Sequence, residues 1–138
     1  MRIMAVDFGD ARTGLAVSDI SGSLAGEAWV LHEKSQKAVS KAVAAEALAR
    51  GVGRIVIGYP KNMDGSAGPR AEKSERLAGL LRAECDIETV LWDERMTTVS
   101  AHRILTETGR YGKKRKNAVD AVAASLILEN YLLFLKEK

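Results

Sequence analysis

The amino-terminal part of the chain contains three short apolar runs separated by residues that favour turns. Runs of this length, bounded in this way, predict three strands joined as an antiparallel meander, at residues 3–6, 15–19 and 28–32. From Ser35 the apolar positions recur at helical spacing, and Gly51 stands where such a helix would end. The first third of the chain therefore predicts three strands followed by a helix.

The rest of the chain continues to alternate between strand and helix patterns. A fully apolar strand after a helix is typical of a crossover connection with parallel pairing. The predicted elements are a strand at 54–58, a helix at 69–83, a strand at 87–92, a helix from Thr97 or Thr98 to 109, and a helix at 118–136 capped by Asn117. We therefore predict an α/β fold, with a five-stranded mixed sheet of three antiparallel and then two parallel strands, flanked by helices.

Composition agrees with one ordinary globular domain spanning residues 1–138. The apolar content of 46% is sufficient for a core, and the longest apolar run is too short to cross a membrane. One cysteine, Cys85, excludes an intramolecular disulfide and fits a reducing compartment. We expect a cytoplasmic protein without a membrane partner.

Charge is unevenly distributed, although the net charge is only +3. The run Lys113, Lys114, Arg115 and Lys116 favours a polyanionic partner, and its alternative role is a solvated loop. Aromatic residues make up only 5% of the chain, which argues against a surface that stacks many bases on rings.

Acidic residues end two predicted strands and enter the last helix. Asp7 ends the first strand, Asp93 and Glu94 end the fifth, and Asp120 lies in the apolar last helix. If these ends meet, the clustered carboxylates require a cation, and a set of oxygen ligands suits Mg²⁺ or Mn²⁺. Each residue also has a simpler role: Asp7 can cap a turn, Asp120 can complete a capping box with Asn117, and Asp93 or Glu94 can pair with a nearby cation.

Other polar positions fit contacts to a phosphate backbone. Loops and helix starts present backbone N–H groups, hydroxyls and cations to anions. The candidates are Arg12, Lys61, Ser66, Arg95, Thr97 and Thr98. As alternatives, Arg12 can form a surface salt bridge, the loop with Lys61 and Ser66 can be merely flexible, and Thr97 and Thr98 can be helix caps.

Four stretches of the sequence together resemble the motifs of the YqgF (RuvX-like) family. They read VDFGDARTGLAVSD at 6–19, GYPKNMDGS at 58–66, DERMTT at 93–98 and KNAVDAVAA at 116–124. The motifs occur in the family's order and span nearly the whole chain.

The resemblance implies a ribonuclease H-like fold and a metal-dependent nuclease. Members of the family are described as nucleases that mature the 5′ end of the 16S ribosomal RNA precursor, and as Holliday junction resolvases. By this resemblance Asp7, Asp120 and one of the pair Asp93–Glu94 form the acidic site. We favour Glu94 as the middle metal ligand because its side chain is longer.

Several alternatives remain open at this point. If the protein is a nuclease, its substrate is either precursor rRNA, with the ribosome as a further partner, or branched DNA. It acts either as a monomer or as a homodimer. A second hypothesis is a non-catalytic RNA-binding factor of the ribosome or of transcription. A third is a nucleotide-phosphate binder, because the first motif also resembles the phosphate loop of actin-like ATPases.

Overall fold

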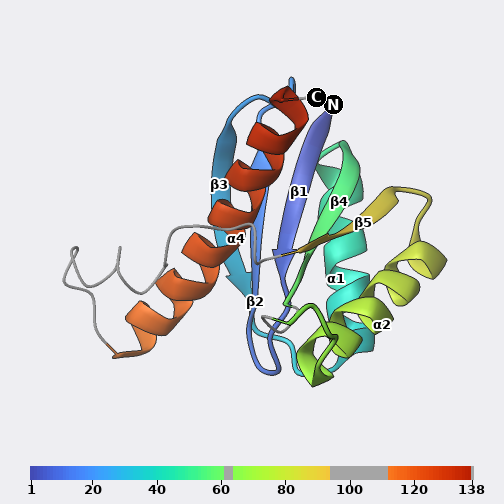
Figure 1. The fold of residues 1–138 in the computed structure, drawn as a ribbon, viewed down its shortest axis with the longest axis vertical. Helices are drawn as coiled ribbons and strands as arrows, with labels where there is room; N and C mark the ends of the chain where they lie inside the picture. The colour runs from blue at the N-terminus through green and yellow to red at the C-terminus, as the bar shows by residue number, and fades with distance from the viewer. Residues whose placement is uncertain (61–63, 94–111, 138) are drawn as a thin grey trace.

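The computed structural model describes residues 1–60, 64–93 and 112–137, and in these residues a five-stranded sheet is covered by helices on both faces (Figure 1). The described elements follow the predicted succession of strands and helices. They are β1 (Arg2–Asp7), β2 (Thr13–Ser18), β3 (Ala25–Leu31), α1 (Gln36–Ala49), β4 (Val52–Tyr59), α2 (Pro69–Glu84), β5 (Glu88–Asp93) and α4 (Gly112–Lys136). The helix predicted to begin at Thr97 or Thr98 lies outside the described residues.

The strand order of the sheet is β3-β2-β1-β4-β5. β1 pairs antiparallel with β2, and β2 pairs antiparallel with β3, whereas β4 is parallel to both β1 and β5. This confirms the predicted mixed sheet. Because β1, β4 and β5 run in the same direction, their carboxyl ends lie at one edge of the sheet, opposite the end that holds the termini (Figure 1).

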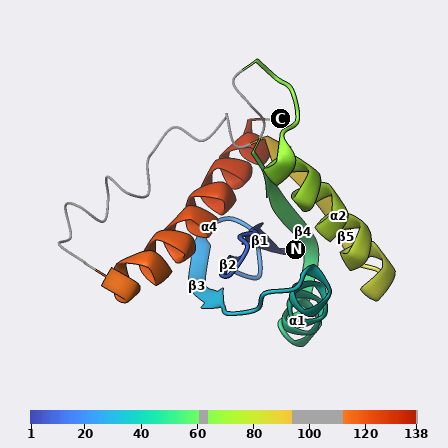
Figure 2. The same ribbon diagram turned by 90° about the horizontal axis from the view of Figure 1, so that it is seen from below.

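Side-chain alternation divides the apolar residues between two cores, one on each face of the sheet. Met4 and Val6 of β1 pack in the core shared with α1 and α2, and Ile3 and Ala5 pack in the core shared with α4. Figure 2 shows the three layers, with α4 on one side of the strands and α1 and α2 on the other.

Helix α1 has the limits that the sequence predicts. The Ser35 side chain caps it by accepting a 3.0 Å hydrogen bond from the backbone N–H of Ala38. Beyond the last turn, Gly51 has a φ of +69°, which glycine adopts without steric cost.

Helix α4 begins earlier than predicted. It starts at Gly112, so Asn117 lies inside the helix and does not cap it. The residues at 113–116 are lysines and an arginine, which favour helix, and a capping preference worth about 1 kcal/mol did not stop propagation through them. Asp120 is eight residues past the start, which excludes the capping-box role.

Polar and aromatic contacts hold α4 on the sheet. Arg54 of β4 donates a 3.0 Å hydrogen bond from Nη1 to the Tyr131 hydroxyl. Trp92 of β5 meets the Tyr131 ring edge-on at a centroid distance of 5.4 Å. In the part of the chain that the structure describes, neither α4 nor any other helix is long and apolar enough to cross a lipid bilayer.

Candidate functional site

Asp7 lies at the end of β1, on the face of the sheet that α4 covers. It shares this face by alternation with Ile3 and Ala5, whose side chains belong to the α4 core. Its antiparallel partner in the sheet is Gly14 of β2, which shares the same face with Ala16. Asp7 and Gly14 are therefore side by side beneath the amino-terminal half of α4.

Gly14 lets the backbone of α4 rest directly on β2. A Cβ atom at Gly14 would lie 2.0 Å from the carbonyl oxygen of Asp120 and 3.3 Å from the Cβ of Ala124. Such distances exclude any larger residue at this position while the helix stays where it is. Ala124 is fully buried at the same contact, where its small side chain lets the helix lie close to the sheet. The residue paired with Asp7 is thus the one that Asp120 touches.

Arg12 connects the turn after β1 to the same segment of α4. Its Nε donates a 2.8 Å hydrogen bond to Oδ2 of Asp120, and the side chains are 36% and 21% exposed, respectively. The turn that carries Arg12 is tight, because a Cβ at Gly9 would lie 2.4 Å from the Arg12 carbonyl oxygen. Sequence reasoning named Arg12 as a phosphate ligand and did not find its contact with Asp120.

Strand β5 ends at Asp93, so the structure describes Asp93 but not Glu94. Trp92 packs in the α4 core, so alternation places Asp93 on the opposite face, which α1 and α2 cover. Asp93 pairs in the sheet with Tyr59, whose hydroxyl donates a hydrogen bond to Glu75 of α2. Glu94 lies outside the described residues.

The predicted phosphate ligands other than Arg12 fall into three groups. The Ser66 hydroxyl and backbone N–H both donate to Oδ1 of Asp64, at 2.6 and 2.9 Å, which forms a local turn. Lys113, Lys114, Arg115 and Lys116 lie in the first two turns of α4, in a helix instead of the predicted loop. The candidates outside the described residues are Lys61, Arg95, Thr97 and Thr98.

A basic depression of about 130 Å³ lies next to the turn after β1, lined by Phe8, Gly9, Asp10, Arg70 and Lys73. Lys73 of α2 contacts Asp10 with an Nζ–Oδ1 distance of 2.7 Å. The Lys73 hydrogen bond, followed by its charge, lowers the pKa of the Asp10 carboxyl. No local pattern in the sequence indicates this contact, because the two residues are far apart in the chain.

No complete metal site is present among the described carboxylates. Within residues 1–60, 64–93 and 112–137 there is no group of three or more acidic, histidine or cysteine side chains placed to hold one ion. Asp7 pairs with Gly14, against which the backbone carbonyl of Asp120 rests, and alternation places Asp93 on the other face. A complete site on the α4 face would require a further carboxylate beyond residue 93.

Comparison with known proteins identifies the family. A family model described as "RuvX: Holliday junction resolvase" matches residues 1–133. The chain belongs to the RuvX family. RuvX relatives curated as "Putative pre-16S rRNA nuclease" include one from Halothermothrix orenii, 43% identical over 132 residues, which cover 96% of this chain and 94% of that protein. Another, from Thermoanaerobacter pseudethanolicus, is 41% identical, and the match covers all of both chains.

The RuvX chain also resembles a solved resolvase in fold. The Fowlpox virus resolvase, solved with Holliday junction DNA, has a TM-score of 0.57 and 13% identity, over 98% of this chain and 99% of that one. At this identity the likeness shows the fold alone. Together with the sheet order, it confirms the predicted ribonuclease H-like architecture.

We expect Gly14→Ala to lower the free energy of unfolding by about 1–3 kcal/mol, because the added methyl group collides with the Asp120 carbonyl. The matched control is Gly79→Ala in α2, where a Cβ meets nothing within 4 Å. The Gly79→Ala substitution should raise the free energy of unfolding by about 0.5–1 kcal/mol, since alanine favours helix. Urea denaturation measures both changes. A Gly14→Ala protein as stable as the unaltered one would show that α4 does not rest on β2 here.

Proposed function

We propose that the chain is a metal-dependent nuclease that hydrolyses phosphodiester bonds in structured nucleic acid. The observation that carries the proposal is the contact of α4 with Gly14, which puts Asp120 beside the residue paired with Asp7. Two carboxylates from opposite ends of the chain then share one face at the edge of the sheet. Family membership, and relatives named as nucleases, support the same activity.

The residues of this site fit a divalent cation. Asp120 already binds a cationic group, the guanidinium of Arg12, which occupies part of the space where positive charge is favoured. Oxygen ligands of this kind suit Mg²⁺ or Mn²⁺. When bound, such ions activate water for attack on phosphorus and stabilise the leaving oxygen. Asp7 and Asp120 would hold the cation, and Arg12 would bind and orient the phosphate.

We infer that Glu94 is the third carboxylate. Alternation along β5 puts Trp92 on the α4 face and Asp93 on the other, and the same period of two assigns position 94 to the set of Trp92. Gly58 of β4 pairs with Trp92 and lies between β5 and β1 on that face, where its lack of a side chain leaves room. Strand alternation supports Glu94 more strongly than the length of its side chain does.

The first turns of α4 provide a second contact with the nucleic acid. They project past the sheet at the end of the molecule that holds Asp7 (Figures 1 and 2). Lys113–Lys116 lie at a helix amino terminus, where the helix dipole disfavours cations and favours anions, so a phosphate backbone would relieve the repulsion. Lys61, Ser66, Arg95, Thr97 and Thr98 are proposed to complete the surface.

The preferred substrate is the precursor of 16S ribosomal RNA, in keeping with the names of the relatives at about 40% identity. The family description and the Fowlpox virus complex name Holliday junctions, which makes branched DNA the second candidate. A resolvase cutting two strands symmetrically would act most simply as a homodimer. Parallel cleavage assays on both substrates distinguish these candidates.

We expect Asp7→Asn and Glu94→Gln each to reduce Mg²⁺-dependent cleavage at least about 100-fold, because each removes a negatively charged ligand that would hold the metal ion. Asp93→Asn is the matched control from the opposite face and should retain cleavage within a few-fold. Initial rates on precursor rRNA and on a four-way junction measure the effect. Unchanged cleavage by Asp7→Asn, with thermal unfolding also unchanged, would remove Asp7 from the mechanism.

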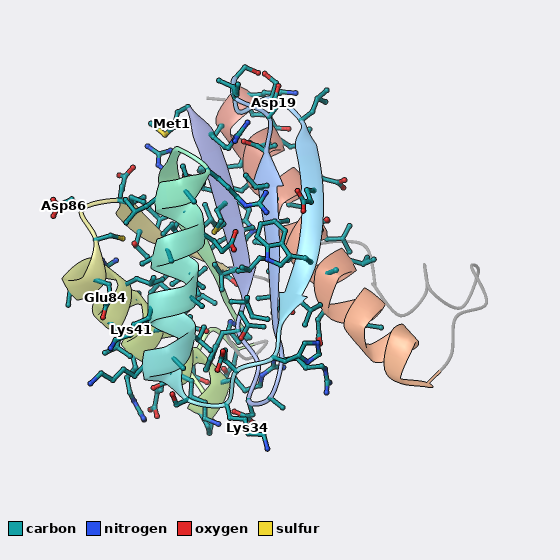
Figure 3. The ribbon with its side chains drawn as sticks, turned by 180° about the vertical axis from the view of Figure 1, so that it is seen from behind. Met1, Asp19, Lys34, Lys41, Glu84 and Asp86 are labelled. Carbon is teal, nitrogen blue, oxygen red and sulfur yellow. The ribbon has the colours of Figure 1, made fainter. Side chains whose placement is uncertain are left out.

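We expect replacement of Lys113–Lys116 by glutamine to weaken nucleic-acid binding and to lower the salt slope of log K by up to about 3, because four phosphate contacts are lost. A matched variant loses four exposed cations elsewhere, Lys37, Lys41, Arg76 and Lys136, and should bind nearly normally. Figure 3 shows Lys41 pointing away from α1, on the face opposite α4. Fluorescence anisotropy at several salt concentrations measures both. Equal loss in the two variants would indicate a general charge effect instead.

A further inference from the structure

The ion pair of Arg12 and Asp120 places a cation on a carboxylate that the proposed function assigns to a metal. Arg12 Nε lies 2.8 Å from Asp120 Oδ2, and this is the bond that the structure records for the Asp120 side chain among the described residues. A guanidinium at this distance and a divalent ion on the same carboxylate repel each other strongly. Arg12 and a metal ion would therefore compete for Asp120.

The side chain of Arg12 can leave Asp120 without movement of the backbone. It is 36% exposed, so the guanidinium has solvent on one side. The main chain of the turn is fixed by the close contact of Gly9 with the Arg12 carbonyl oxygen. Rotation of the side chain would carry the guanidinium into solvent, where a phosphate could accept two parallel hydrogen bonds from it.

We propose that Arg12 is a built-in counterion, which neutralises Asp120 in the absence of metal and transfers to a substrate phosphate when the metal binds. This inference rests on the proposed metal-dependent function. It makes metal binding and nucleic-acid binding mutually favourable, because each takes one partner away from the Arg12–Asp120 pair. By linkage the two ligands must raise each other's affinity by the same factor.

If the ion pair of Arg12 and Asp120 has only a structural role, removal of Arg12 should change the metal affinity in the opposite direction. If Arg12 holds Asp120 in the geometry that a metal needs, its removal should weaken metal binding or leave it unchanged. If Arg12 competes for the carboxylate, its removal should tighten metal binding. The direction of the change therefore separates the two roles.

The test measures Mn²⁺ affinity of the full chain by isothermal titration calorimetry, without nucleic acid. Arg12→Gln should bind Mn²⁺ about threefold more tightly, the effect of losing a partly exposed ion pair. Arg70→Gln is the charge-matched control in α2 next to the same turn, and its affinity should stay near that of the unaltered protein. Asp120→Asn should abolish binding at this site. An unchanged or weaker affinity in Arg12→Gln, or an equal gain in Arg70→Gln, would overturn the proposal.

A second measurement follows the NMR signal of the Arg12 side chain in the unaltered protein. The Arg12→Gln variant is needed only to assign that signal. The Nε–Hε resonance of Arg12, identified by its loss in Arg12→Gln, should shift as Mg²⁺ saturates the Asp120-dependent site. A resonance that stays in place at saturation would contradict release of Arg12.

The outcomes also distinguish this inference from the proposed function. If the unaltered protein binds Mn²⁺ through Asp120 and Arg12→Gln has no tighter binding, the inference fails and the metal site stands. If the unaltered protein binds no Mn²⁺, both fail.

Discussion

The close contact between α4 and Gly14 is the constraint on which the site depends. A backbone oxygen of the helix occupies the place where any other residue would have its Cβ, so the contact fixes the height and the axial position of α4 over β2. Gly14 pairs with Asp7, and the helix residue above it is Asp120. One missing side chain thus decides how near two carboxylates from opposite ends of the chain can come. The Tyr131 contacts further along the helix hold it in that position.

Arg12 reduces the electrostatic repulsion that this arrangement of carboxylates would otherwise cause. Two carboxylates gathered at the edge of a sheet repel each other unless a cation lies between or beside them. The turn after β1 supplies a guanidinium from the same motif that supplies Asp7, and it binds Asp120. The turn is short enough to keep Arg12 at the site, because Gly9 lets it close tightly. The Arg12–Asp120 pair therefore lets the chain keep the proposed acidic site when no metal ion is bound.

Much of the fold could be predicted from periodicity. The apolar runs gave the strands, and the helix between residues 35 and 51 indicated where antiparallel pairing changes to parallel pairing. The start of α4 could not be predicted from Asn117, because a cap preference is weaker than continued helix formation by good helix-forming neighbours. The proposal of Glu94 over Asp93 rests on the face on which Trp92 packs, which the sequence alone did not show. The Arg12–Asp120 pair joins residues too distant in the chain for local patterns to connect, as does the Lys73–Asp10 pair.

The central claim is that Asp7 and Asp120 form one cation site across Gly14. Paramagnetic broadening of backbone amide NMR signals by substoichiometric Mn²⁺ tests it most directly. The account predicts that the signals of Asp7, Gly14 and Asp120 broaden together at the lowest Mn²⁺ concentrations. Those of Asp19, at the opposite end of the molecule (Figure 3), should stay sharp. Broadening of Asp7 without Asp120, or of neither residue while other signals broaden, would contradict it.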